Sequence, residues 1–290
     1  MNETKIRTIH TEDSDQGGLA MKTAPVSVVI PCFRCTATID DAVASIMAQT
    51  LRPAEVILIE DGSGDETLAS LYRIASAHEA GWIKVIALAD NGGPSRARNA
   101  GWQQAEQPYI AFLDADDTWG PHKLELQMAA LEADPAIVLI AHRMMVCPRG
   151  TPVPELRAPL RTQLVGRGAL LFHNPFPTAS VVLRRDLQFR FDNDVRRSED
   201  YLLWSQIVFS GYRCAKIDQV LAIWNAREHG AVGLSDDFVA VHRARRGMRW
   251  KLLREGLISW PEYIFVLGIG VLSSLRRRLR RGGAYRPKPG

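Results

Sequence analysis

The sequence predicts an α/β fold in which helices cover both faces of a mostly parallel central sheet, with a helical tail at the C-terminus. Short apolar runs rich in valine and isoleucine alternate with segments of helical periodicity before residue 114. This alternation predicts right-handed crossovers between parallel strands. Polar, turn-forming strings follow the first, second and fourth apolar runs. Because ligands bind such sheets beyond the carboxyl ends of the strands, we expect these strings to meet at one site.

A polar leader is expected to precede the ordered chain. Residues 1–24 contain glycine but no periodicity, which predicts disorder and leaves Met21 as an alternative start. Val26–Ile30 is a β-branched run that stops at Pro31, as a buried strand would. The elements expected next are strands at 26–30, 55–59, 83–88 and 109–113, and helices at 38–50, 67–78 and 94–104.

The pattern becomes less regular after Pro135. We expect strands at 137–145 and 180–183, a proline-rich loop at 148–159 and a helix at 201–209. The second half therefore continues the domain with shorter elements.

Length and composition exclude a small scaffold that depends on cross-links. With 290 residues and 46% hydrophobic content, the chain can bury a core unaided. Its four cysteines, at positions 32, 35, 147 and 214, lack the spacing of a disulfide framework, and no apolar signal segment opens the chain. We therefore expect a reducing, cytoplasmic environment. Cys32 and Cys35 have the spacing of a redox or zinc pair, but zinc would need a second pair, and we expect neither role.

The C-terminal tail differs in charge from the rest of the chain. Residues 242–290 hold 13 of the 36 lysines and arginines but only two of the 32 acidic residues, so the tail carries +11 and the remainder −7. This asymmetry indicates an anionic partner surface, either phospholipid or nucleic acid. The apolar run 263–272 is shorter than the roughly 20 residues of a membrane span, but with the arginines of 276–281 it suits a helix lying in the membrane interface. The alternative is a helix packed on the domain, followed by a solvated basic end.

An acidic string, Asp114-Ala115-Asp116-Asp117, follows the fourth strand. In an extended segment, residues i and i+2 project to the same side, so Asp114 and Asp116 can both face the crevice. Two carboxylates suit Mg²⁺ or Mn²⁺, which would neutralise a leaving diphosphate. The alternative is a turn in which Asp117 or Thr118 caps a helix starting near Pro121, and for Asp117 we favour the cap.

Four segments of the chain together resemble glycosyltransferase family 2: 28–33, 59–67, 91–101 and 112–117. The resemblance implies a GT-A fold, with a nucleotide-sugar donor-binding half at 25–135, an acceptor-side half at 136–240 and a basic helical or membrane-surface tail at 241–290. It also implies an inverting, metal-dependent transfer of a sugar, expected to come from a UDP-sugar, to an acceptor hydroxyl in cell-surface polysaccharide biosynthesis.

The resemblance assigns roles to particular residues. Phe33 would flank the base of the nucleotide, and Asp61 would accept a hydrogen bond from its imide. For the phosphates we favour Arg96 and expect Arg98 to point to solvent. The residues implied to bind the nucleotide-sugar are Pro31, Phe33, Asp61, Arg96, Asp114 and Ala115, and those implied to bind the metal are Asp116, Asp114 and His229. His229 lies in a segment similar to an Arg-x-His motif, and a plain surface histidine is the alternative.

A second motif, Glu199-Asp200 before a tryptophan-containing segment, resembles the Glu-Asp motif of the family. Asp200 matches the base that takes the proton of the acceptor hydroxyl, and Glu199 would position the acceptor or partly replace the base. The alternative is a helix amino terminus formed by Ser198 with acids in its first turn.

Two other functions remain open. A sugar-phosphate nucleotidyltransferase would be expected to carry a glycine-rich, lysine-containing loop where this chain has Pro31–Arg34. A catalytically inactive membrane-surface scaffold is disfavoured by intact Asp61, Asp116 and Asp200. The partners expected for the transferase are a nucleotide-sugar donor, a glycan or lipid-linked glycan acceptor, and an anionic membrane surface reached through 260–281, with no nucleic acid. The expected location is the cytoplasm, peripheral on the cytoplasmic face of the inner membrane.

Overall fold

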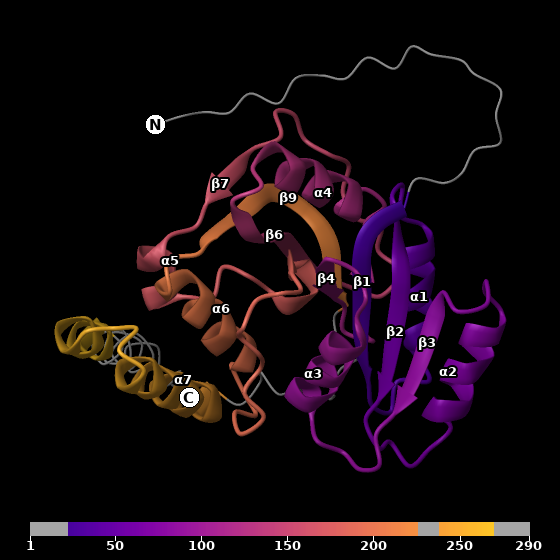
Figure 1. Ribbon diagram of the computed structural model, residues 1–290, viewed down its shortest axis with the longest axis horizontal. Coiled ribbons are helices and arrows are strands. Elements are labelled where there is room, and N and C mark those ends of the chain that lie inside the picture. Colours follow the sequence, from indigo (N-terminus) through magenta and orange to yellow (C-terminus); the bar gives the residue numbers. More distant parts are fainter. Residues whose placement is uncertain (1–22, 226–237, 270–290) are drawn as a thin grey trace, which may run out of the picture.

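The computed structural model describes residues 23–225 and 238–269, and in this part of the chain the strands form one continuous sheet (Figure 1). The strands are β1 (Thr23–Cys32), β2 (Arg52–Glu60), β3 (Ile83–Ala87), β4 (Tyr109–Phe112), β5 (Thr118–Trp119), β6 (Ile137–Cys147), β7 (Thr162–Leu164), β8 (Val182–Arg184) and β9 (Arg213–Asn225). The helices are α1 (Ile39–Met47), α2 (Thr67–Ser76), α3 (Pro94–Gln104), α4 (Lys123–Ala133), α5 (Arg167–Phe172), α6 (Glu199–Phe209) and α7 (Phe238–Arg254), with a 3₁₀ turn at Thr178–Ser180. Residues 260–269 are also helical.

The predicted α/β fold is confirmed. The strand order is β3-β2-β1-β4-β8-β6-β9-β5, with β7 paired to β9. The pairs among β3, β2, β1 and β4 are all parallel, as predicted from the alternation of strands and helices. Beyond β4 the sheet is mixed, because β8 runs antiparallel between β4 and β6, and β5 and β7 run antiparallel to β9.

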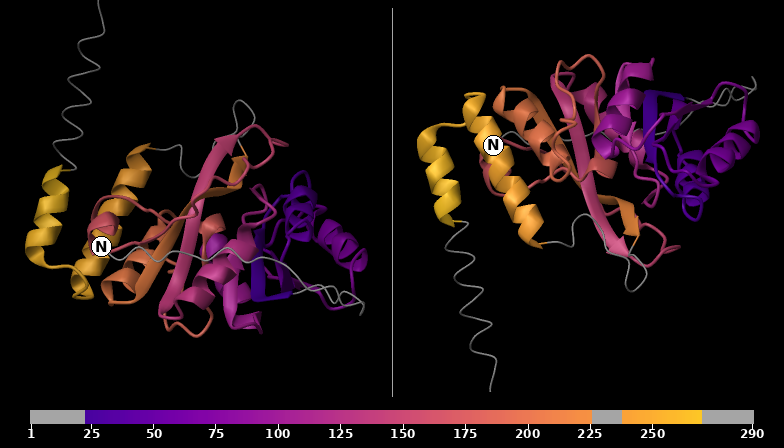
Figure 2. Two further views of the ribbon diagram at one scale, coloured as in Figure 1. Left: turned by 90° about the horizontal axis from the view of Figure 1, so that it is seen from above. Right: turned by 90° about the horizontal axis from the view of Figure 1, so that it is seen from below.

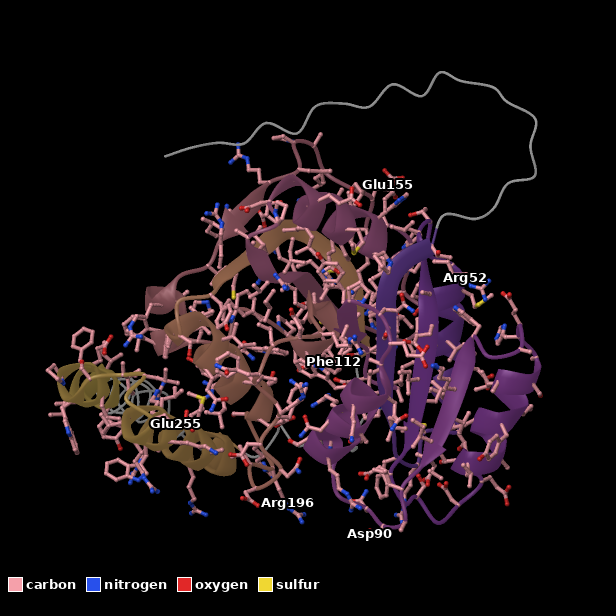
Figure 3. The ribbon with its side chains drawn as sticks, viewed as in Figure 1. Arg52, Asp90, Phe112, Glu155, Arg196 and Glu255 are labelled. Atoms are coloured by element: carbon pink, nitrogen blue, oxygen red, sulfur yellow. The ribbon has the colours of Figure 1, made fainter. Side chains whose placement is uncertain are left out.

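The central strands are buried on both faces, which explains their nearly continuous apolar sequence. Along β1, Val28 and Ile30 pack toward α1, α2 and α4, whereas Val29 packs toward α3 and α6. Phe112, at the end of β4, is buried and lies in the middle of the molecule (Figure 3). The sheet therefore carries a hydrophobic core on each of its two faces.

Glycine is required where α3 crosses β1. A β-carbon at Gly101 would lie 2.3 Å from Cγ1 of Val29, well inside van der Waals contact. The missing side chain lets the helix approach the sheet closely. This close packing seats α3 against β1, and the helix also contacts β2.

The observed elements differ from the prediction at several points. Strand β1 begins at Thr23, so the last two residues of the predicted leader belong to the sheet, and residues 1–22 lie outside the described residues. The longest element that the sequence analysis missed is β9. Its register with β6 shifts at several points, and buried and exposed residues therefore do not alternate regularly along it, so its sequence lacks the pattern of a strand. Helix α7 begins at Phe238, inside the segment assigned to the acceptor half.

The described part of the tail packs on the domain. Met248 and Leu252 of α7 are buried in the core cluster that also contains the apolar residues of α6. Figure 2 shows α7 and the helix after it together on one flank of the molecule, next to α6. Among the described helices, none combines the length and the hydrophobicity needed to cross a bilayer.

Candidate active site

The turns after β1 and β2 are joined by backbone and side-chain hydrogen bonds. The amide of Asp61 donates to the carbonyl of Cys32 over 2.9 Å. The amide of Arg34, whose φ of 49° is left-handed, donates to the hydroxyl of Ser63 over 3.0 Å. Phe33 stands at this junction with 45% of its surface exposed, and Pro31 before it is half-buried. The exposed ring is therefore available to a flat ligand at the ends of the first two strands.

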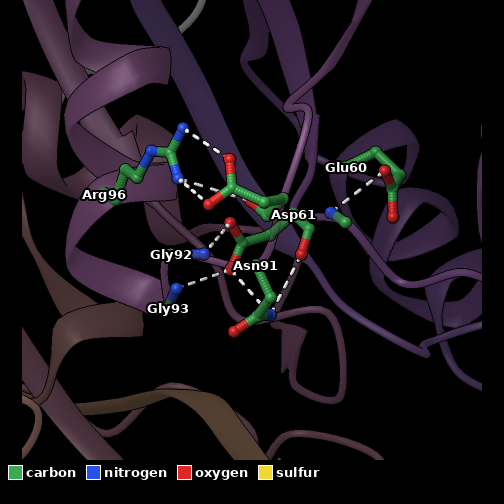
Figure 4. Close-up of polar contacts among 8 residues, drawn as sticks. Glu60, Asp61, Asn91, Gly92, Gly93 and Arg96 are labelled. Atoms are coloured by element: carbon green, nitrogen blue, oxygen red, sulfur yellow. Dashed lines mark hydrogen bonds and ion pairs between the residues drawn. The ribbon is translucent and has the colours of Figure 1, made fainter.

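Asp61 ties the end of β2 to the start of α3 (Figure 4). Its carboxylate accepts hydrogen bonds from the amides of Gly92 and Gly93, over 3.0 and 2.8 Å, and from the side-chain amide of Asn91 over 3.1 Å. Only 2% of Asp61 is exposed, and burial raises its pKa although the two glycine amides oppose this shift. The carboxylate therefore holds the loop before α3 in place.

The two arginines at the start of α3 lie in different surroundings. The side chain of Arg96 is 39% exposed and bonds to the carboxylate of Asp90 over 3.0 Å (Figure 4). Arg98 is 5% exposed, contrary to the expectation that it points to solvent. Its guanidinium donates to Asp114 over 2.7 Å and to Glu199 over 3.0 Å. Two positions along a helix correspond to a rotation of about 200°, which turns Arg98 toward the interior while Arg96 stays outside.

The acidic string after β4 forms a turn rather than an extended segment. The amide of Asp117 donates to the carbonyl of Asp114 over 3.0 Å. Asp114 and Asp116 are half-buried, and the carbonyl of Asp116 accepts a hydrogen bond from Asn225 over 2.7 Å. Ala115 between them is buried. The end of β9 thus fixes the backbone that carries the two carboxylates.

The prediction that Asp117 caps the following helix is wrong. Helix α4 begins at Lys123, and His122 occupies its N-cap position. The intervening residues Thr118 and Trp119 form β5, which pairs with Ile223 and Ala222 of β9. This pairing keeps the chain extended and separates Asp117, which is 1% exposed, from the helix.

Asp200 is held by hydrogen bonds at the amino terminus of α6. Its carboxylate accepts from the amide of Tyr201 over 2.7 Å, from Asn174 over 2.9 Å and from the hydroxyl of Thr178 over 3.3 Å. Burial raises its pKa, against the effect of the Tyr201 amide and the charge of Arg98. Ser198, at the N-cap position, makes no capping bond through its side chain. The two partners Asn174 and Thr178 come from a proline-rich stretch that the sequence interpretation missed.

Glu199 and Asp200 influence each other. Burial raises the pKa of Glu199, the neighbouring Asp200 charge raises it further, and Arg98 opposes both effects. Arg98 thus connects Asp114, after β4, with Glu199 at the start of α6. The predicted residues therefore form two groups at the ends of the strands: Phe33, Asp61 and Arg96 around the first two turns, and Asp114, Glu199 and Asp200 around Arg98.

The carboxylates after β4 suit a metal ion that is held partly by the protein and partly by a substrate. Within the described ranges, no group of three or more histidine, cysteine or acidic residues is arranged to hold a metal ion, and His229 lies outside them. Magnesium is commonly held by one or two carboxylates together with substrate phosphates. Asp114 and Asp116, two carboxylates on one turn, fit that arrangement.

The chain is similar in sequence to known glycosyltransferases. The sequence model described as Glycosyl transferase family 2 matches residues 27–190. The succinoglycan biosynthesis protein ExoO of Rhizobium meliloti is 29% identical over 220 residues, which cover 71% of this chain and 62% of ExoO. The β-1,3-glucosyltransferase WfgD of Escherichia coli, whose name specifies UDP-Glc and α-D-GlcNAc-diphosphoundecaprenol, is 28% identical over 63% of this chain and 69% of its own.

Solved structures share the fold at low sequence identity. TarS 1-349 from S. aureus in complex with UDP-GlcNAc superposes with a TM-score of 0.61 at 22% identity, covering 79% of this chain and 66% of that one. The mannosyltransferase PcManGT from Pyrobaculum calidifontis, in complex with GDP-Man and Mn²⁺, gives 0.57 at 17% identity, covering 94% and 85%. These similarities establish the architecture.

Proposed function

Because the chain belongs to glycosyltransferase family 2 and has the GT-A fold, we propose that it is an inverting glycosyltransferase that moves a sugar from a nucleotide-sugar to an acceptor hydroxyl in cell-surface polysaccharide biosynthesis. The observation that carries this proposal is the bridge from Asp114 through Arg98 to Glu199. It brings Asp114, from the proposed donor-binding half at 25–135, next to the acidic pair of the proposed acceptor-side half at 136–240. Group transfer needs both substrates in one such place.

The donor would lie over the turns after β1 and β2. Phe33 offers an exposed ring for stacking on the base, and Asp61 would accept a hydrogen bond from the base imide through its remaining lone pairs. Arg96 would leave its ion pair with Asp90 and bind the phosphates of the donor. The backbone at Pro31 and Ala115 would line the donor site. We infer a UDP-sugar, since the name of WfgD specifies UDP-Glc and TarS was solved with UDP-GlcNAc.

Asp116 and Asp114 would hold Mg²⁺ or Mn²⁺, with His229 as a further ligand. When bound, such an ion neutralises the charge of the departing diphosphate. Arg98 orients Asp114 by binding one of its two carboxylate oxygens and so acts as a positioning residue. The assignment is supported by PcManGT, which shares the fold and was solved in complex with GDP-Man and Mn²⁺.

Asp200 would act as the general base. The acceptor oxygen forms a bond to the anomeric carbon while the bond from that carbon to the diphosphate oxygen breaks, and Asp200 takes the hydroxyl proton. Attack from the face opposite the diphosphate inverts the configuration. A raised pKa makes Asp200 a better proton acceptor, and the Asn174 and Thr178 contacts fix its orientation. Glu199, held by Arg98, would position the acceptor.

The acceptor is proposed to be a lipid-linked glycan at the cytoplasmic face of the inner membrane. The name of WfgD specifies an acceptor joined to diphosphoundecaprenol. Such a substrate presents its sugar at the membrane surface, so the enzyme would work as a peripheral protein.

The test is a donor screen that measures UDP or GDP release and sugar transfer to a short-chain GlcNAc-diphospho-lipid, with and without Mn²⁺. Wild type is compared with Asp116→Ala and Asp200→Asn, and with Asp186→Asn, an exposed carboxylate paired to Arg184 outside the site. We expect metal-dependent release that Asp116→Ala abolishes. We expect Asp200→Asn to bind donor but to transfer at least about a hundredfold more slowly. Equal transfer by Asp200→Asn and wild type would reject the base.

A further inference from the structure

The outward face of the C-terminal helix, residues 260–269, is apolar. Its exposed positions fall on one side at helical spacing: Trp260, Pro261, Ile264, Phe265, Gly268 and Ile269. The sole charged residue of this helix, Glu262, turns inward and accepts two hydrogen bonds of 3.0 Å from Arg167. Val266 is buried against the domain. A helix on a water-exposed surface normally shows the reverse, with charges outside.

Aromatic contacts extend this surface onto two other helices. Trp250 of α7 contacts Trp260 with ring centroids 6.0 Å apart, and Tyr263 lies beside both, at 6.0 and 6.1 Å. Phe172, at the end of α5, lies 6.3 Å from Phe265. Trp250 is 45% exposed, and Trp260 and Phe265 are each 59% exposed. We call the exposed side chains of this set the apolar face; its members are Phe172, Trp250, Trp260, Ile264, Phe265 and Ile269.

Positive charge borders the apolar face. Arg243, Arg246 and Arg254 are exposed on α7. Together with Trp250 they form one stripe, in the order Arg243, Arg246, Trp250 and Arg254 at positions i, i+3, i+7 and i+11. The sequence from 270 to 290 adds seven lysines and arginines and no acidic residue. Tryptophan and tyrosine between an apolar surface and arginine side chains are typical of a membrane–water boundary.

The charge distinguishes an anionic lipid surface from a second copy of this chain. In a two-fold symmetric dimer the same patch faces itself, so the arginines of the two copies would approach one another. Anionic headgroups instead complement the arginines while the aromatic rings enter the boundary. The apolar face is also larger than scattered surface hydrophobics account for, since its members lie in contact across three helices.

We propose that the apolar face and the arginine stripe of α7 bind the surface of an anionic phospholipid bilayer, with the helix 260–269 lying in the plane of the interface. Helix α6, which begins with Glu199 and Asp200, packs directly on α7. Binding therefore holds the acceptor side of the site next to the membrane, a consequence that rests on the function proposed above.

Vesicle flotation of the full chain tests the proposal. Vesicles of phosphatidylglycerol and phosphatidylcholine are compared with vesicles of phosphatidylcholine alone at about 0.15 M salt, where charges are screened beyond roughly 8 Å. We expect flotation with the anionic vesicles and at least about tenfold weaker binding to the neutral ones, because the neutral headgroups do not attract the arginines of the stripe.

Three variants separate the contributions. Trp260→Ser/Phe265→Ser removes the two most protruding rings, and Ile264→Asp places a charge on the apolar face without removing an aromatic contact. Both are expected to weaken vesicle binding at least about tenfold. Tyr72→Ser is the control, since Tyr72 is 55% exposed on α2, which Figure 1 shows on the opposite side of the molecule from α7. Its binding should equal that of wild type, and all three variants should retain the wild-type melting temperature within about 3 °C.

The proposal is overturned if wild type does not float with anionic vesicles, or if Ile264→Asp floats as well as Tyr72→Ser. It is also overturned if sedimentation shows a dimer that Ile264→Asp converts to monomer while vesicle binding stays unchanged. Donor hydrolysis in vesicle-free buffer is measured in parallel. Loss of flotation with hydrolysis intact refutes the membrane surface alone, and flotation without hydrolysis refutes the proposed enzyme alone.

Discussion

Arg98 places one buried positive charge among three carboxylates. Burial disfavours its charge, but Asp114, Glu199 and the more distant Asp200 more than compensate and raise its pKa above the ordinary value. Its loss would leave two half-buried carboxylates facing one another without a counter-charge. Breaking a buried ion pair by removing one partner costs about 3–5 kcal/mol, far more than an exposed pair contributes.

Arg98→Met should therefore lower the free energy of unfolding by about 3–5 kcal/mol, measured by urea denaturation at pH 7. Arg96→Met is the matched control, because Arg96 lies on the same helix but its pair with Asp90 is exposed. We expect Arg96→Met to unfold at nearly the wild-type urea concentration. If both variants lose the same stability, the bridge does not hold the two halves together.

Asp200 should make stability depend on pH. Its pKa in the folded state is raised above the ordinary 3.8 by burial, so the folded protein binds a proton that the unfolded chain has already released. Stability should therefore fall as the pH rises from below 3.8 through the raised pKa. Asp200→Asn removes the titration but keeps the shape of the side chain.

The stability of Asp200→Asn relative to wild type should accordingly improve as the pH rises from about 3.5 to 7. Urea denaturation of both proteins across this range measures the difference, with Asp186→Asn as control. The pKa of exposed Asp186 is lowered by Arg184, so its substitution should change relative stability in the opposite direction. A difference between Asp200→Asn and wild type that is constant across this range would contradict the raised pKa.

How far single residues were predictable depends on whether their partners are local. The carboxylates stand out in the sequence because they follow apolar strands. Arg98, Asn174, Thr178 and Asn225 were misassigned or missed because their partners lie on other elements, such as Asn225 at the end of β9 on the carbonyl of Asp116. Nothing near these residues in the sequence specifies those contacts.

At the scale of elements, the loop after β2 and the loop before α3 are in direct contact. Gly62 has a φ of 64°, and a β-carbon there would lie 2.5 Å from the amide nitrogen of Asn91. Asn91, Gly92 and Gly93 bind Asp61, so displacing their loop would disturb the proposed base-binding residue. Gly64 has a similar φ of 67° but no heavy atom within 4 Å of its hypothetical β-carbon.

Gly62→Ala should weaken the binding of UDP by at least about tenfold, measured by titration calorimetry, because it forces the two loops apart. Gly64→Ala carries the same left-handed strain of roughly 1 kcal/mol without the clash and should bind UDP like wild type. If both variants bind UDP equally well, contact between the loops does not shape the donor site.

The first half was predictable element by element because each buried parallel strand has an apolar, β-branched sequence. Helix α3 was predicted with its observed limits, since Pro94 marks its first turn. The second half was less predictable: β9 carries polar residues at exposed positions, and β5, β7 and α5 are too short to show a period. Strands β5 and β7 form by pairing with β9, and α5 packs on α6. These are contacts between distant parts of the chain, which a local sequence pattern does not reveal.

At the scale of the whole molecule, one sheet runs through both proposed halves, and β8 joins them by pairing with β4 on one side and β6 on the other. The core cluster on the face of α3 contains residues from both halves, including Val29, Leu139 and Trp204. The halves should therefore unfold together, and a ligand held in one of them should stabilise both.

Calorimetry should accordingly show one unfolding transition that UDP-sugar shifts as a unit. At a donor concentration about 100 times its dissociation constant, binding adds about 2.7 kcal/mol, which corresponds to a rise in melting temperature of about 5–10 °C for a chain of this size. Adding Mn²⁺ with the donor should raise the melting temperature further in wild type and in Asp186→Asn, but not in Asp116→Ala, which lacks the proposed metal ligand.

Two transitions, of which the donor shifts only one, would mean that the halves are separate folding units despite their common sheet. An equal response of Asp116→Ala to Mn²⁺ would place the metal elsewhere.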